Sequence, residues 1–272
     1  MNIKRFIFSS AAVAIGLFAS AFSTDTVVVA TEYLATPMKV TVITPEAAKS
    51  TQNKFPTVYL LNGYGGDYTS WTTIQPRLGE LADTYGMVMV MPDGRDSWYI
   101  NSTTDPKMQM ESFFTEDLVP FIDSHFPTAT EPAKRAITGL SMGGHGGMYL
   151  ATRHPNIWGN MGSTSGGINI LPFPKKWKLE KALGAYADNP KIWEENTVIN
   201  MIPRIKENGQ NIIFDCGSED FFAEINNDLH KKLLEAKVPH DYISRPGTHN
   251  MKYWANSVLY QLLYFHNKFQ GK

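Results

Sequence analysis

The stretch Gly139-Leu140-Ser141-Met142-Gly143 has the pattern G-x-S-x-G. It follows the short apolar segment RAIT and precedes GGHGGMYLATRH, which predicts a strand, a sharp turn and a helix. A serine at such a turn has a strained backbone, and a side chain at position 139 or 143 would collide with the adjoining strand or helix. The pattern predicts Ser141 as the nucleophile of an acyl-transfer reaction. A glycine-rich helix start that only packs closely on a sheet is the alternative.

A serine hydroxyl needs a base to remove its proton, and seven histidines are available. Four of them lie on helix-like segments, where a single histidine is usually a surface or core residue: His125, His154, His230 and His266. His240 precedes the predicted strand DYISR, at the wrong end of the sheet, and His145 lies too early in the chain. His249, in RPGTHN, follows that strand and is therefore the predicted base.

The base in turn needs a carboxylate, which in a strand-turn-helix hydrolase lies between the serine and the histidine in chain order. The segment NIIFDCGSEDFF offers Asp215, Glu219 and Asp220. Asp215 belongs to the apolar run, whereas Glu219 and Asp220 lie in the loop after it. We predict Asp220 as the acid and keep Glu219 as the alternative.

An acyl-transfer site also needs backbone N–H groups that stabilise a developing oxyanion. The residue after the nucleophile, Met142, supplies one of them. The second is expected from the glycine-rich loop LLNGYGGDYTSW, where Tyr64 follows Gly63. An ordinary tight turn is the alternative for this loop.

Short apolar runs alternate with amphipathic stretches along most of the chain, as in TVYLLN, IQPRLGELADTY and MVMVMPDG. This alternation predicts an α/β fold, with a mainly parallel sheet covered by helices on both faces and a site at the carboxyl ends of its strands. The segment from Ile168 to Arg204 breaks the pattern, and we interpret it as a small lid insertion. No linker divides residues 22–272, so we expect one domain.

The first 21 residues have the layout of a secretory signal. Lys4 and Arg5 precede an apolar run, and small residues at Ala19 and Ala21 suggest cleavage after Ala21. A buried first helix or a membrane anchor is the alternative. We expect an exported protein, periplasmic or secreted, without a membrane span after signal removal. Loss of two positive charges takes the formal net charge from −1 to −3.

Composition argues against several classes of protein. An acidic balance offers no basic surface for nucleic acid. A single cysteine, Cys216, excludes an internal disulfide, and no Cys/His cluster has zinc-ligand spacing. We therefore expect no metal and no cofactor. The sequence carries no signal for an oligomeric state.

Several segments together resemble one esterase family of the α/β-hydrolase fold: YLLNGYGGDYTSW, VMPDGRDSWYINS, EDLVPFIDSHFP, RAITGLSMGGHGGMYLATRHPNIWG, STSGGINI and DCGSEDFF. That family includes S-formylglutathione hydrolases, feruloyl and acetyl-xylan esterases and mycolyltransferases. The resemblance implies the same roles for Ser141, Asp220 and His249, with the amides of Tyr64 and Met142 as the oxyanion hole. Relatives commonly have His-Gly where this chain has Asn62-Gly63, which a hole built from a backbone N–H tolerates.

These observations predict an exported serine carboxylesterase that hydrolyses short-chain or aromatic acyl esters, with a small acyl ester or an acylated carbohydrate as substrate. An acyltransferase that uses a sugar hydroxyl as acceptor shares every catalytic residue and stays open. A thioesterase similar to S-formylglutathione hydrolase is a further alternative, although export disfavours it. A non-catalytic binding module is the remaining one.

Aromatic residues near the predicted site suit the apolar face of a sugar or a feruloyl group. Trp98 and Tyr99 follow the apolar run MVMVMP, and we predict that they contact substrate. Packing of these loops onto the core is the alternative. Four lysines of the insertion could attract an acidic polysaccharide or simply form a solvated helix face: Lys175, Lys176, Lys178 and Lys181.

Overall fold

The computed structural model describes residues 22–272, so the predicted signal segment 1–21 lies outside the described residues. The chain forms an eight-stranded sheet in the order β1-β2-β4-β3-β5-β6-β7-β8. Only the β1/β2 and β2/β4 pairs are antiparallel. The strands are β1 (Ser23–Val29), β2 (Met38–Thr44), β3 (Thr57–Leu61), β4 (Val88–Pro92), β5 (Arg135–Gly139), β6 (Asn160–Thr164), β7 (Asn211–Gly217) and β8 (Asp241–Arg245).

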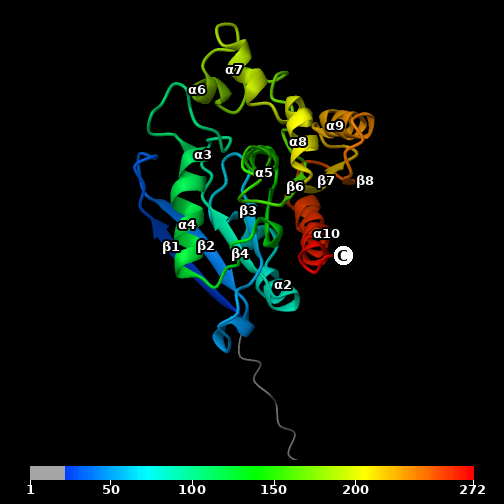
Figure 1. The fold of residues 1–272 in the computed structure, drawn as a ribbon. Coiled ribbons are helices and arrows are strands. Elements are labelled where there is room, and N and C mark those ends of the chain that lie inside the picture. The colour runs from blue at the N-terminus through cyan, green and yellow to red at the C-terminus, as the bar shows by residue number, and fades with distance from the viewer. Residues whose placement is uncertain (1–21) are drawn as a thin grey trace, which may run out of the picture.

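The central strands are apolar on both faces because helices cover both sides of the sheet. All five residues of β3, β4 and β5 are buried. One face packs on α1 (Ser70–Ile74), α2 (Leu78–Tyr85) and α10 (Met251–Phe269). The opposite face carries α3 (Met110–Ser112), the π-helical η2 (Phe113–Leu118), α4 (Val119–His125), α5 (Met142–Arg153), α8 (Ile202–Asn208) and α9 (Ala223–Glu235). This arrangement confirms the predicted α/β-hydrolase architecture (Figure 1).

The insertion extends beyond the sheet, where α6 (Leu179–Leu183) and α7 (Pro190–Glu195) lie at one end of the molecule (Figure 1). It is not a loose flap, because Leu179, Leu183 and Trp193 are fully buried in the core. The carbonyl of Ala182 also accepts the backbone N–H of Thr103, at 2.8 Å. The insertion is therefore anchored to the loop that follows β4.

Three short 3-10 turns complete the elements: η1 (Glu46–Lys49), η3 (Pro132–Lys134) and η4 (Val198–Met201). Between residues 22 and 272, no helix has both the length and the apolar character required to cross a membrane.

Candidate active site

Ser141 lies at the sharp turn between β5, which ends at Gly139, and α5, which begins at Met142. Its backbone has φ 55° and ψ −114°, a strained conformation for a residue with a side chain. The turn is held on both sides. The N–H of Ser141 donates to the carbonyl of Thr164 at 3.0 Å, and its carbonyl accepts the N–H of Gly167 at 3.1 Å. The strain is thus stored in a turn that the neighbouring strand fixes.

The two outer glycines of the pattern are required by close backbone approach. A Cβ atom at Gly139 would lie 2.6 Å from the backbone of Gly143 and 2.6 Å from the Cβ atom of Leu61. A Cβ atom at Gly143 would lie 2.4 Å from the carbonyl oxygen of Leu61. Real Cβ atoms do not approach so closely, so only glycine permits this turn at either position.

A continuous chain of hydrogen bonds connects Ser141, His249 and Asp220. The Nε2 atom of His249 lies 2.9 Å from the Oγ atom of Ser141. Its Nδ1 atom lies 2.9 and 3.0 Å from the two carboxylate oxygens of Asp220. Since a carboxylate only accepts, Nδ1 carries a proton and Nε2 faces the serine hydroxyl as an acceptor.

Loops at the ends of two adjacent strands, β7 and β8, position Asp220 and His249. Asp220 follows β7 and is buried, and one of its oxygens also accepts the N–H of Phe222 at 2.8 Å. His249 follows β8 and directly precedes Asn250, whose side chain caps α10 by accepting the N–H of Tyr253. Glu219, the alternative acid, is exposed.

The loop after β3 lies against the serine. A Cβ atom placed on Gly63 would be 3.4 Å from the Cβ atom of Ser141, so the backbone of the next residue, Tyr64, lies near Ser141. In the described part of the chain, the N–H groups of Tyr64 and Met142 donate to no other protein group. Neither donor is therefore committed to another hydrogen bond.

Asn62 holds this loop in place from the core. The side chain is fully buried, and its Nδ2 atom donates to the carbonyl of Gly63 at 2.9 Å. Its Oδ1 atom accepts the N–H of Gly94 at 2.8 Å and the hydroxyl of Tyr99 at 3.1 Å. The asparagine thus joins the loop after β3 to the loop after β4.

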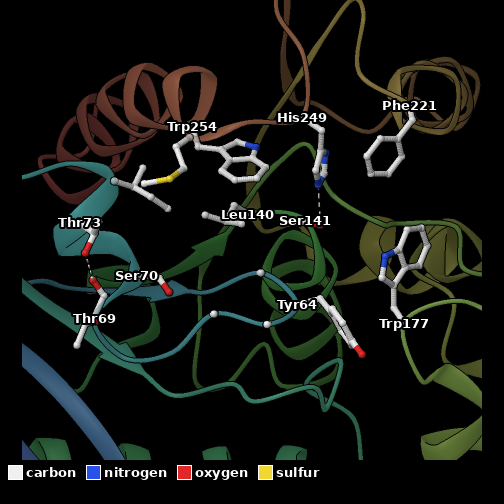
Figure 2. A pocket seen from close by; sticks show the side chains of 15 residues that line it. Tyr64, Thr69, Ser70, Thr73, Leu140, Ser141, Trp177, Phe221, His249 and Trp254 are labelled. Atoms are coloured by element: carbon white, nitrogen blue, oxygen red, sulfur yellow. Dashed lines mark hydrogen bonds between the residues drawn. The ribbon is translucent and has the colours of Figure 1, made fainter.

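A pocket of about 580 Å³ opens above Ser141. On one side of Ser141 lie side chains of α1 and α10, and on the other lie three aromatic rings (Figure 2). The first group includes Ser70, Thr73 and Trp254, and the second comprises Tyr64, Trp177 and Phe221. The pocket is thus mainly apolar and has the Ser141 hydroxyl between its two sides.

Trp98 and Tyr99 lie behind this pocket rather than in its wall. Tyr99 is fully buried and donates to the carbonyl of Asn62 at 2.9 Å. Trp98 is 2% exposed and its indole N–H donates to the carbonyl of Trp177 at 3.2 Å. This packing argues against direct contact of either ring with a substrate.

Sequence reasoning missed three rings that do line the pocket: Trp177, Phe221 and Trp254. Phe221 directly follows the predicted acid, and Trp254 lies on the first turn after the predicted base. Their positions in the chain were therefore a usable signal. Trp177 lies within the insertion, and no local pattern sets it apart from other tryptophans.

Asp215 is buried and hydrogen-bonded to three side chains away from His249. Its carboxylate accepts hydrogen bonds from Thr164 at 2.7 Å, Ser257 at 2.6 Å and Gln261 at 2.6 Å. Burial raises the pKa of Asp215, against the effect of these donors. Since Ser257 and Gln261 belong to α10, the network fixes the helix that follows His249.

A buried network attaches the insertion to α5, the helix that follows Ser141. The ring nitrogens of His145 lie 3.2 Å from the carbonyl of Trp98 and 2.9 Å from that of Asn196, and burial lowers the pKa of His145 to about 4.

Glu111 is the buried carboxylate of a second group of polar side chains on this face of α5. Tyr149 donates to Glu111 at 2.8 Å. Burial disfavours ionisation of Glu111, but hydrogen bonds from His154, Arg153 and Tyr149 outweigh it and lower the pKa to about 2.

The described residues 22–272 contain no cluster of three or more His, Cys, Asp or Glu side chains arranged to hold a metal ion.

Comparison with known proteins identifies the family. The chain is 28% identical over 214 residues to an acetyl esterase of Caldicellulosiruptor saccharolyticus, covering 74% of this chain and 80% of the relative. It is 30% identical over 152 residues to an endo-1,4-beta-xylanase/feruloyl esterase of Xylanibacter ruminicola, covering 51% of this chain and 20% of that protein. The solved structure of the serine hydrolase FphF of Staphylococcus aureus superposes with a TM-score of 0.80 at 18% identity, covering 90% of this chain and 98% of that chain. The model of the Esterase family matches residues 31–265, and the protein therefore belongs to that family of serine hydrolases.

Proposed function

We propose that this esterase hydrolyses short-chain or aromatic acyl esters, carried on carbohydrate, through Ser141, His249 and Asp220, and that it does so after export. The hydrogen-bonded chain from Asp220 through His249 to Ser141 carries the proposal. A serine held this way at the floor of an apolar pocket is equipped to attack an ester carbonyl.

In the proposed reaction, His249 takes the hydroxyl proton of Ser141 while Oγ bonds to the carbonyl carbon. The N–H groups of Tyr64 and Met142 stabilise the negative oxygen of the tetrahedral intermediate. His249 then gives the proton to the departing alcohol, which leaves an acyl group on Ser141. Water, deprotonated by His249, releases the acid and restores the serine.

The pocket favours small or planar acyl groups over long alkyl chains. Its volume of about 580 Å³ is shared between the two sides of Ser141. The names of the two relatives, an acetyl esterase and a xylanase/feruloyl esterase, agree with acyl groups of this size on a carbohydrate.

Hydrolysis of acetyl, butyryl, palmitoyl and feruloyl esters and of acetylated xylan tests this function. We expect turnover of acetyl or feruloyl esters to exceed that of the palmitoyl ester. Faster turnover of the palmitoyl ester would contradict the proposal. Addition of an alcohol acceptor distinguishes hydrolysis from acyl transfer, because a transferase forms a new ester in preference to the free acid.

A further inference from the structure

We propose that Trp177 and Phe221 form a clamp for a planar aromatic ring of the substrate. The inference rests on the proposed function and narrows its substrate class to aryl-containing esters. Trp177 comes from the insertion and Phe221 from the loop after β7, so two segments far apart in the chain meet at one side of the pocket (Figure 2).

The two rings lie close together and nearly parallel. Their planes are 19° apart and their centroids are separated by 6.1 Å. A flat ring between them needs a separation of about 7 Å, since each face makes carbon contacts at about 3.5 Å. Because the separation of 6.1 Å is smaller than this, Phe221 must move away from Trp177 to admit the ring. A puckered sugar ring is thicker, so the spacing favours a planar aromatic group.

Phe221 is exposed on its solvent side, which leaves room for this movement, and it lies next to His249. The side chain is 57% exposed, and its ring centroid lies 4.3 Å from that of His249. An exposed phenylalanine at the mouth of a reactive pocket leaves apolar surface in water until a ligand covers it. A ring held there would lie next to His249, whose Nε2 atom is 2.9 Å from the Oγ atom of Ser141.

The backbone at Trp177 is strained in a way that the fold maintains. Trp177 and Lys178 are consecutive non-glycine residues with positive φ, at 47° and 56°. Such conformations cost free energy and persist where the surroundings impose them, often at ligand sites. Here the carbonyl of Trp177 accepts the indole N–H of Trp98 at 3.2 Å.

A charged contact adds to this constraint and links the clamp to the loop of Tyr64. The ammonium of Lys178 lies 2.6 Å from one carboxylate oxygen of Asp96, whose other oxygen accepts the N–H of Gly65 at 3.3 Å. The fold thus supports the position of Trp177 from the same loop that carries Asp96 and Trp98. Asp96 and Trp98 are positioning residues, and the rings of Trp177 and Phe221 make the contact.

The test compares three esters on the full chain: methyl cinnamate with its ring in the acyl group, phenyl acetate with its ring in the alcohol, and ethyl butyrate without a ring. The variants are Trp177→Ala, Trp177→Phe and Phe221→Ala, with Tyr260→Ala as control. Tyr260 is also an exposed ring, but it lies on α10 outside the pocket lining.

We expect Trp177→Ala and Phe221→Ala to lower kcat/KM for a ring-bearing ester, relative to ethyl butyrate, by roughly 3- to 10-fold, the range for loss of one aromatic pair. The loss should appear in KM, and Trp177→Phe should retain most of the selectivity. The ester that responds, cinnamate or phenyl acetate, identifies the end of the substrate that enters the clamp. Tyr260→Ala should leave the ratio unchanged.

Equal effects on all three esters, or no effect, would overturn the clamp. A fall in kcat on all esters in Phe221→Ala would assign Phe221 to the support of His249 instead. If the wild-type protein hydrolyses none of the three esters, the proposed function fails before the clamp is tested. Thermal unfolding of Trp177→Ala and Trp177→Phe separates loss of fold from loss of selectivity.

Discussion

The Nε2 atom of His249 lies 2.9 Å from the Oγ atom of Ser141, although 108 residues separate the two in the chain. In the proposed mechanism, His249 removes the proton of the Ser141 hydroxyl, so turnover requires both residues. We expect Ser141→Ala to lower ester turnover by at least about 10³-fold while the melting temperature stays near that of the wild type. Ser218→Ala, in the exposed loop before Asp220, is the matched control. Near-wild-type turnover in Ser141→Ala would remove the serine from the mechanism.

Replacement of Asp220 by asparagine should be severe, on the order of 10⁴-fold in kcat, because an amide no longer fixes the proton on Nδ1 of His249. Glu219→Gln should be mild, since Glu219 is exposed and the adjacent carboxylate holds the histidine. Steady-state rates of the two variants on one ester decide the assignment. The reverse ranking would transfer the role of acid to Glu219.

Asn62→Ala should impair both stability and turnover. The change leaves the N–H of Gly94 without its acceptor and removes a partner of Tyr99, at about 1–3 kcal/mol for a buried unsatisfied group. It also removes one of the two donors to the carbonyl of Gly63, beside the N–H of Tyr64, and leaves only the N–H of Gly66. Urea unfolding gives the loss of stability, and kcat under native conditions gives the effect on the loop. Unchanged kcat would show that the loop keeps its shape without Asn62.

Gly143→Ala should disrupt the serine turn, because its Cβ atom would lie 2.4 Å from the carbonyl oxygen of Leu61. Overpacking of this kind costs about 1–3 kcal/mol, and the serine shifts with the turn, so turnover should fall strongly. Gly209→Ala is a useful comparison. Gly209 has φ 63° but no neighbour within 4 Å, so alanine there is strained without a collision and should leave turnover intact. Equal turnover in the two variants would contradict the steric argument.

Stability should depend on pH through His145. Burial lowers its pKa to about 4 from the ordinary 6.5, so between these pH values the unfolded chain binds a proton that the folded chain does not. The free energy of unfolding should therefore fall as pH decreases from 6.5 to 4. Urea unfolding across this range should show a shallower slope for His145→Gln, with the exposed His125→Gln as control. The same slope in wild type and His145→Gln would exclude His145 as the cause.

The sequence by itself predicted the sheet class and the serine turn. Strands buried on both faces have continuous apolar sequences. The turn at Ser141 admits only glycine at positions 139 and 143, so its glycine pattern is visible in the sequence. The order of residues along the chain and the position of the strand ends also predicted His249 as the base, because a loop at the carboxyl end of a parallel strand faces the site. These features are local, or follow from how parallel strands align.

Only the tertiary structure decided which of the candidate acids contacts His249 and which of the candidate aromatic rings lines the pocket. Glu219 and Asp220 are adjacent in the same loop, and the packing of β7 against β8 determines that Asp220 reaches His249. Likewise, Trp98 and Trp177 are equally suitable aromatic residues by type. Both have positive φ, yet the ring of Trp98 is buried in the core, 2% exposed, whereas the ring of Trp177 lines the pocket. Such choices depend on contacts between segments distant in sequence, for which the local pattern of residues carries no signal.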